Sequence, residues 1–330
     1  MPTQKTYSHL QHLKRKPTEY ELVSSELLYY VRRGFEVRVP LGEWYRRHQQ
    51  ASPFACSDWE RFYDPRETTY TKYTELQKSK EIFVDGLLRI IDETGYDAGL
   101  SRDWIRILDR TLGPLRFPIH GLQMVAAYVG HMAPAGRITM AALFQAADEM
   151  RRVQRLAYRT RQLQNVHPEF ARDSRSIWQE DPLWQPLRQV VENLLVTYDW
   201  GEAFTVLNLV LKPMFDELFL TGFGRLALSQ GDDLLDKIFM SLNEDCAWHR
   251  AWSHALVLVA SNDRPATGTT IGAWVDRWRP AVARAIAAFR PIFDEMPRQS
   301  AGPAFADVVA RVEASCQAYW ASANLATHEA

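Results

Sequence analysis

The sequence predicts an all-α protein, and three observations support this fold class. From about residue 58 onwards apolar residues recur at helical spacing, as in Leu76, Phe83 and Leu87, which is the pattern of a helix with one buried face. Helix-start signals precede several such segments, for example Ser101 as a cap with Asp103 in the first turn. The sequence shows neither a βαβ nor a hairpin pattern, and no fixed internal repeat.

The helices are expected to follow one another along the chain, with a polar break after Gln164 before helix restarts at Asp181-Pro182. The first is expected to begin at Asp64-Pro65, since proline fits the first turn of a helix, and to reach about Asp92. Gly113-Pro114 is expected to end the second helix, and the polar run 262–268 is expected to form a loop. The remaining expected helices cover about 101–114, 118–132, 137–164, 181–197, 199–220, 232–260, 270–293 and 303–325.

The first 55 residues lack helical periodicity and are predicted to form an extended arm. At most one short helix is expected in it, near Thr18–Tyr30, and Lys14–Lys16 form a basic patch that either contacts an acidic partner or is merely solvated. Because this arm is rich in Tyr and Trp, it is expected to lie on the helices or on a partner, the alternative being a partly disordered tail. The predicted organisation is an arm over 1–55 and a helical domain over 56–330, with accessory C-terminal helices from about 267.

Composition excludes several classes of function. Lys plus Arg (39) nearly balance Asp plus Glu (40), so no overall charge attracts nucleic acid or an anionic membrane. Cys56, Cys246 and Cys316 are an odd, widely spaced set, which indicates reduced thiols rather than disulfides. The N-terminal residues lack an apolar signal segment, and apolar runs such as 255–260 are too short to span a bilayer. The sequence therefore predicts a soluble cytoplasmic protein.

Aromatic residues are numerous, with 11 Trp, 13 Tyr and 15 Phe. Such side chains are enriched at protein–protein interfaces, because they bury much area for little lost rotamer freedom. A large aromatic core explains the same composition, and the sequence leaves both interpretations open.

An incomplete metal motif stands in the fourth predicted helix. Di-iron carboxylate bundles bind iron through two Glu-x-x-His pairs and a lone Glu from each of two other helices. Glu149 is followed three residues later by Arg152, which cannot ligate iron. None of the nine His residues has an acidic residue three positions before it. The sequence also lacks a Ser-His-Asp order, a P-loop and a Gly-x-Gly-x-x-Gly motif.

An ordered set of segments carries a family resemblance over about residues 7–290. The chain resembles the hydroxylase β subunit of bacterial multicomponent (soluble di-iron) monooxygenases, in the toluene/alkene monooxygenase branch. The segments that carry the resemblance are Lys16–Glu21, Leu28–Tyr30, Asp58–Glu60, Asp64-Pro65, Gln123–Val129, Met132–Pro134, Ala157–Thr160, Asp199–Phe204, Leu207–Val210, Lys212-Pro213, Trp274 and Trp278–Pro280.

The resemblance implies a ferritin-like long-helix bundle with extra C-terminal helices. It implies a non-catalytic structural β subunit that supports an iron-bearing α subunit in an (αβγ)₂ hydroxylase. The assembly would oxygenate an aromatic or alkene hydrocarbon with O₂ and NADH-derived electrons. A reductase or ferredoxin and a small regulatory protein would dock on it.

The resemblance also assigns former iron-ligand positions. Glu149 keeps its identity while Arg152 replaces the His, and His249 is kept while Cys246 replaces the Glu. The lone-Glu positions fall at or beside Ala127 and within Leu207–Leu211, where no acidic residue occurs. With at most two of six ligands present, the chain is expected to hold no metal, no cofactor and no catalytic residue, and the di-iron centre is expected in the α subunit.

We expect Glu149 to point inward and to form a buried ion pair with Arg152, joined by His249. The alternative is that Arg152 turns outward with Arg155 and Arg159. Two rival functions remain: a self-sufficient metalloenzyme with a site near Asp245 and His249, and a helical interaction protein outside any oxygenase. We expect Cys246 to be an inert buried thiol.

Overall fold

Helices dominate the described part of the chain. The structure, a computed structural model, describes residues 14–16, 41–295 and 302–325. Over these ranges no β-strand occurs, and the all-α fold class is confirmed. The chain divides into two units, residues 1–46 and 47–330.

The predicted arm over 1–55 lies mostly outside the described residues, as does the short helix expected near Thr18–Tyr30, so the arm stays a prediction. Its described end is partly helical instead of extended, with α3 (Leu41–Tyr45) and the π-helical turn η2 (Arg46–Gln50). The Gln49 side-chain amide donates to the carbonyl oxygen of Met132 at 2.7 Å. This contact ties the turn to the end of a long helix.

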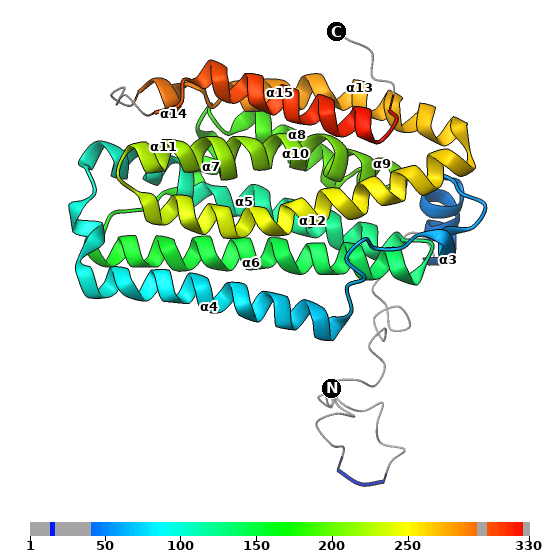
Figure 1. The fold of residues 1–330 in the computed structure, drawn as a ribbon, viewed down its shortest axis with the longest axis horizontal. Coiled ribbons are helices and arrows are strands. Elements are labelled where there is room, and N and C mark those ends of the chain that lie inside the picture. Colours follow the sequence, from blue (N-terminus) through cyan, green and yellow to red (C-terminus); the bar gives the residue numbers. More distant parts are fainter. Residues whose placement is uncertain (1–13, 17–40, 296–301, 326–330) are drawn as a thin grey trace, which may run out of the picture. The chain divides into compact units, whose positions relative to one another are not determined.

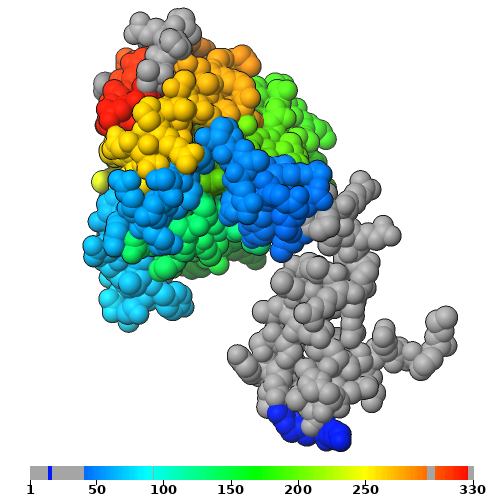
Figure 2. Space-filling model, turned by 90° about the vertical axis from the view of Figure 1, so that its right-hand side faces the viewer, coloured from blue at the N-terminus to red at the C-terminus, as the bar shows by residue number. Residues whose placement is uncertain are grey.

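The long helices of the second unit lie side by side in layers (Figure 1). Between α4 at one edge and α13 and α15 at the other run α6, α12 and, behind them, α5. The end view in Figure 2 shows α12, in yellow, between α4 in cyan and α13 in orange. The bounds of the long helices are α4 Tyr70–Thr94, α5 Arg102–Met132, α6 Gly136–Val166, α12 Asp233–Asp263, α13 Pro265–Ala287 and α15 Phe305–Ser322.

Shorter helices complete the unit. They are η3 Trp59–Arg61, η4 Tyr96–Gly99, α7 Ser174–Glu180, α8 Gln185–Leu195 and α14 Arg290–Asp294. A continuous helical run connects α8 to α12 and consists of α9 Trp200–Thr205, η5 Val206–Leu211, α10 Lys212–Asp216, η6 Glu217–Phe223 and α11 Gly224–Ser229.

Side-chain caps explain where two of the helices begin. Ser101 caps α5 as predicted, because its hydroxyl oxygen accepts from the Trp104 backbone N–H at 3.1 Å. The predicted start at Asp64-Pro65 is wrong, since α4 begins at Tyr70 after the cap Thr69. The Asp64 carboxylate instead accepts from the backbone N–H groups of residues 66 and 68 and so stabilises a turn.

The predicted break at Gly113-Pro114 is also wrong, because α5 runs without interruption from Arg102 to Met132. Pro114 has no N–H to donate to the carbonyl oxygen of Arg110, four residues earlier. The indole N–H of Trp184 donates to that oxygen at 3.0 Å. A hydrogen bond from the residue that precedes α8 thus satisfies the carbonyl that the proline leaves without its helical partner.

Replacing Trp184 with phenylalanine is expected to lower the free energy of unfolding by about 1–3 kcal/mol, because the Arg110 carbonyl then lacks a donor. Urea denaturation followed by circular dichroism measures this change. Adding Pro114→Ala to the variant restores a helical N–H to the same carbonyl and should recover part of the loss. An equal loss with and without Pro114→Ala would mean that the lost volume, and not the hydrogen bond, sets the cost.

The helical run from Trp200 continues to Ser229 and not only to the predicted Leu220. Gly222 and Gly224 lie where η6 passes into α11. A Cβ on Gly222 would stand 2.6 Å from a methyl carbon of Val308. Glycine at this position therefore lets α15 approach closely.

The predicted loop over 262–268 is a sharp corner of a single residue. Helix α12 ends at Asp263 and α13 begins at Pro265, so only Arg264 separates them. The ring of Pro265 fixes a helical φ at the first position of α13, where the missing N–H costs no hydrogen bond. The polar composition that suggested a loop belongs to two helix ends.

Aromatic side chains fill much of the interior. Trp104, Trp184, Trp200 and Trp252 are at most 1 % exposed, which supports a core role for these four. The Trp252 indole donates to the Gln145 side-chain oxygen at 3.0 Å, so its polar atom is satisfied. Among the described helices, none combines the length and apolar character that crossing a membrane requires.

Candidate functional site

Buried charges meet in the middle of the bundle. Helix α6 contributes Glu149 and Arg152, α10 contributes Lys212 and Asp216, and α12 contributes Cys246 and His249. All six residues are at most 3 % exposed. We call these six residues the central cluster.

Two cations and two carboxylates alternate within the central cluster. The Arg152 guanidinium lies 2.7 Å from a Glu149 oxygen and 3.1 Å from Asp216. The Lys212 ammonium lies 2.6 Å from Glu149 and 2.8 Å from Asp216. The predicted buried Glu149–Arg152 pair is confirmed, and the alternative in which Arg152 faces outward is wrong. Each buried charge is stabilised because it faces opposite charges on both sides.

The pKa values of these groups follow from the pairing. Burial, the largest single effect, would lower the pKa of Lys212, but Asp216, Cys246 and Glu149 together outweigh burial and raise it. Burial would raise the pKa of Asp216, but Lys212 and Arg152 hold it below its usual range. Lys212, Arg152 and Asp216 are therefore charged near neutral pH.

Cys246 and His249 close the cluster on the α12 side. The Cys246 sulfur lies 3.3 Å from the Lys212 nitrogen, and burial raises the pKa of the thiol to about 12, in line with the expected inert thiol. His249 Nδ1 lies 3.8 Å from Glu149, the contact expected from the sequence, and its Nε2 lies 2.9 Å from Asp148. Burial, followed by Lys212 and Arg152, lowers the pKa of His249 well below its usual value.

A second polar layer joins the cluster to α4. Asp148 accepts hydrogen bonds from the Tyr73 hydroxyl at 2.8 Å and from the Gln77 amide at 2.6 Å. Burial, followed by Asp245, raises the pKa of Asp148 well above its usual value. Gln77 also donates to Asp245 at 2.9 Å and so links the two carboxyl groups. The hydrogen bonds of this layer therefore connect α4, α6 and α12.

Stability is expected to fall as the pH drops below about 6.5, because unfolded His249 takes up a proton there while the folded residue does not. The slope attributable to His249 is at most about 1.4 kcal/mol per pH unit, down to its lower folded pKa. Urea unfolding of the wild type and His249→Gln between pH 5 and 7.5 isolates this contribution, since both retain Asp148 with its opposing raised pKa. Identical pH slopes for the two proteins would contradict the prediction.

Sequence reasoning missed two members of the central cluster. The search for an acidic residue stopped at Leu211, whereas Lys212 and Asp216 lie in the next turns. A Lys and an Asp four residues apart inside a strongly apolar segment was the available signal, because such a spacing places both on one helix face. Ala127 lies on α5 and is half-buried, unlike the other positions assigned by the resemblance.

The central cluster does not fit a di-iron centre. Iron sites in helical bundles are built from carboxylates and imidazoles on facing helices, but here Arg152 and Lys212 occupy the space beside Glu149. Both are cations, which repel a metal ion and have no free lone pair to offer it. In the part of the chain that is described, no group of three or more His, Cys, Asp or Glu could hold a metal ion.

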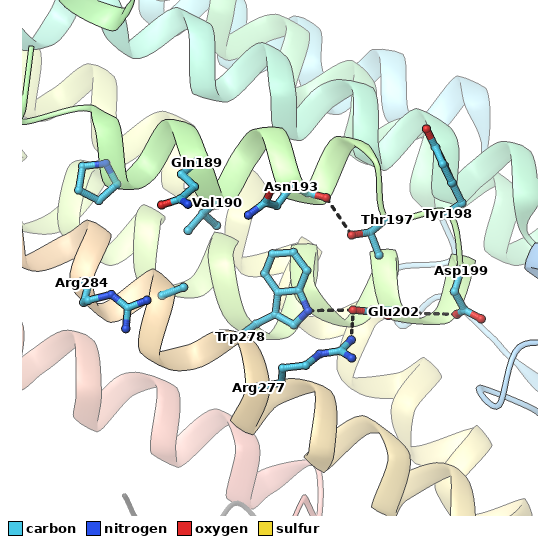
Figure 3. A pocket seen from close by; sticks show the side chains of 12 residues that line it. Gln189, Val190, Asn193, Thr197, Tyr198, Asp199, Glu202, Arg277, Trp278 and Arg284 are labelled. Atoms are coloured by element: carbon cyan, nitrogen blue, oxygen red, sulfur yellow. Dashed lines mark hydrogen bonds and ion pairs between the residues drawn. The ribbon is translucent and has the colours of Figure 1, made fainter. Parts of the chain in front are cut away.

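A surface groove between α8, α9 and α13 has a volume of about 540 Å³ (Figure 3). Glu202 accepts from the Trp278 indole at 2.9 Å and pairs with Arg277. Asp199 caps α9 by accepting from the Glu202 N–H at 2.9 Å. The carboxylates of this groove therefore hold α9 and α13 in place.

Known proteins are similar in sequence to this chain over most of its length. The chain is 34 % identical over 304 residues to the toluene-4-monooxygenase system hydroxylase component subunit beta of Ectopseudomonas mendocina, an alignment covering 89 % of this chain and 93 % of that protein. It is 27 % identical to the propane 2-monooxygenase hydroxylase component small subunit of Rhodococcus jostii, over 75 % of this chain and 69 % of that one.

Solved structures agree with this relationship. A chain of toluene 4-monooxygenase with toluene bound matches with a TM-score of 0.75 and 34 % identity, covering 88 % of this chain and 98 % of the other. Phenol hydroxylase from Pseudomonas sp. OX1 shares the fold, with a TM-score of 0.77 and 21 % identity over 100 % and 98 % of the two chains. The family model described as Methane/Phenol/Alkene Hydroxylase matches residues 44–264. The resemblance predicted from the sequence is confirmed, and the chain belongs to the methane/phenol/alkene hydroxylase family.

Proposed function

We propose that this chain is the structural β subunit of a multicomponent monooxygenase hydroxylase. A larger α subunit would carry the di-iron centre and oxygenate an aromatic or alkene hydrocarbon with O₂ and NADH-derived electrons. This chain would support α, extend the dimer interface and help form the surface on which the other components dock. The proposal is supported by the relative named as a hydroxylase subunit beta, which aligns along nearly its whole length.

One observation carries the structural, non-catalytic part of the proposal. Arg152 and Lys212 each lie within 2.7 Å of Glu149, at the place that would require open carboxylate oxygens for iron. A ring of neutralised charges gives a rigid, unreactive core. The chain would therefore keep the bundle architecture of an iron-binding subunit while its own interior serves only stability.

The rival metalloenzyme site near Asp245 and His249 is less well supported. Asp245 is paired with the Lys80 ammonium at 2.5 Å and with the Arg151 guanidinium at 2.8 Å. His249 Nε2 is engaged by Asp148. A metal at this site would have to displace two cations from Asp245. The other rival, a helical interaction protein outside any oxygenase, is disfavoured by the family to which the chain belongs.

The finer assembly is also part of the proposal. We expect an (αβγ)₂ hydroxylase in the cytoplasm, on which a ferredoxin or reductase and a small regulatory protein dock. Support comes from the names of the relatives, which describe hydroxylase components of larger systems.

Iron analysis of the isolated chain and of the complex purified from the native host tests the proposed function. The isolated chain should contain no stoichiometric iron, whereas the complex should contain iron together with a larger partner subunit. About two irons per isolated chain would overturn the structural role. An iron-free chain that purifies without any larger partner would favour the interaction protein outside an oxygenase.

A further inference from the structure

The outer sides of α5 and α6 together form an unusual surface. Its large apolar side chains are well exposed: Met124 by 48 %, Met140 by 43 %, Leu143 by 47 % and Tyr158 by 50 %. We call the surface formed by these four side chains and the residues between them the α5–α6 face. Apolar side chains that protrude as a group, rather than singly, mark interaction sites.

The exposed residues form one continuous area. On α6, Met140, Leu143, Ala147, Gln154 and Tyr158 are all exposed, and their spacing of three, four or seven residues places them along one side of the helix. Leu143 bridges to α5, because its side chain lies 3.1 Å from the point at which a Cβ on Gly130 would stand. The α6 stripe therefore continues onto α5.

Charge distinguishes this face from the outer side of α4. From Pro118 to Met132, α5 contains no Asp, Glu or Lys. From Ile138 to Thr160, the only acidic residues of α6 are Asp148 and Glu149, and both are fully buried. Between these bounds no acidic side chain is exposed, and Arg161 adds an exposed cation at one end of the α6 stripe.

The outer side of α4 also exposes large apolar side chains, such as Ile82 and Phe83, but it differs in charge. The outer side of α4 bears both signs, with Lys72, Glu75, Lys78, Asp85 and Arg89 exposed. An outer helix face of a soluble protein usually has such a polar pattern. The α5–α6 face lacks such a polar pattern, so exposure of this face to water is unfavourable.

We infer that the α5–α6 face is the surface on which the larger hydroxylase subunit packs, through an apolar helical face bordered by carboxylates. The identity of this partner rests on the proposed function. A second copy of this chain fits poorly, because a two-fold contact brings each face against its equal. Arg161 would then meet no exposed carboxylate on the face of the second copy.

The dimensions of the face suit a stable contact. Between Met140 and Arg161 the α6 stripe is about 32 Å long at 1.5 Å per residue, and two adjacent helices are about 20 Å wide, which gives roughly 600 Å². A stable complex buries about 800 Å² on each partner. The face therefore provides most of such an interface, and neighbouring residues can supply the remainder.

Charge insertion into the face tests the inference. The full chain is co-expressed with the larger iron-bearing subunit of the same organism, and the affinity of the complex is measured for Leu143→Glu and Met140→Glu. Each should weaken the complex by about thirtyfold or more, as expected for a residue central to an interface. Leu143→Lys should weaken it less, because its new charge meets the carboxylates of the partner.

Matched controls place the same charge elsewhere on the helices. Ile82 on α4 is 64 % exposed and Met240 on α12 is 62 % exposed, so Ile82→Glu and Met240→Glu should leave the affinity unchanged. Circular dichroism melting of each isolated variant shows whether it folds. Equal weakening by the controls and by Leu143→Glu would overturn the assignment of this face.

Oxidative footprinting gives a second readout without mutation, because Met and Tyr side chains react with hydroxyl radicals. Binding of the partner should protect Met124, Met140 and Tyr158, while Met240 should stay reactive. If Met124, Met140 and Tyr158 were already protected in the isolated chain, the inference would be overturned, because the chain's own terminal segments or a second copy would cover the face. Sedimentation of the isolated chain distinguishes a monomer from a dimer and so separates these two occupants. A wild-type complex that forms without protecting them would refute this face and leave the proposed function standing.

Discussion

Replacing Arg152 with methionine is expected to lower the free energy of unfolding by about 3–5 kcal/mol, the usual cost of breaking a buried ion pair. Glu149 and Asp216 would then share a single cation, Lys212, at a site where all four side chains are at most 3 % exposed. One negative charge would remain uncompensated in the interior. Urea unfolding at pH 7.5 measures the loss.

A double variant separates the charge from the packing. Arg152→Met with Glu149→Leu removes one cation and one anion, and leaves the Lys212–Asp216 pair at 2.8 Å balanced. It should be more stable than Arg152→Met alone, because no unpaired charge is left in the core. If the single variant lost less than about 1 kcal/mol, a value typical of exposed pairs, the central cluster would not stabilise the bundle as described.

Replacing Arg159 with methionine is expected to cost a similar amount, about 3–5 kcal/mol. The Arg159 guanidinium is fully buried and binds both carboxylate oxygens of Asp97, at 2.8 and 2.6 Å. Such a two-point contact is strong and directional. It holds the η4 turn, Tyr96–Gly99, against α6, so that thermal denaturation should reveal the loss of both the pair and this attachment.

An exposed ion pair serves as the matched control. Lys237 and Asp233 on α12 lie 2.7 Å apart, but their side chains are 48 % and 47 % exposed. Lys237→Ala should change stability by less than about 1 kcal/mol, because solvent screens the charges. Comparable losses for Arg159→Met and Lys237→Ala would show that burial does not determine the strength of the Arg159 contact.

The ion-pair prediction shows what spacing along a sequence can establish. Glu149 and Arg152 are three residues apart on one predicted helix, and an apolar stripe beside them indicates the buried face. Local helix geometry then suffices to bring the two side chains together. Lys212 and Asp216 lie about sixty residues further on, and no local rule places them against Glu149. Their part in the cluster depends on how α10 packs against α6 and α12.

The errors in helix boundaries have the same origin. Pro114 would end a helix if the Arg110 carbonyl, which lacks its helical N–H donor, could bond only to water. Here the Trp184 indole, seventy residues away in sequence, donates to that carbonyl. The residues around Arg264 read as a polar loop, although Pro265 allows two long helices to meet at one residue. In both places a tertiary contact or a tight corner overrides local propensity.

The amino-acid sequence by itself determined the all-α class, the approximate order of the long helices, the family and the inward-facing Glu149–Arg152 pair. Each depends on local periodicity, or on an ordered set of segments that survives without knowledge of packing. Tertiary structure alone decided the contacts of Lys212 and Asp216 within the central cluster, the uninterrupted α5 and the apolar α5–α6 face. These depend on which distant side chains are neighbours and which surfaces remain uncovered, because burial and charge compensation are set by the packing of whole helices.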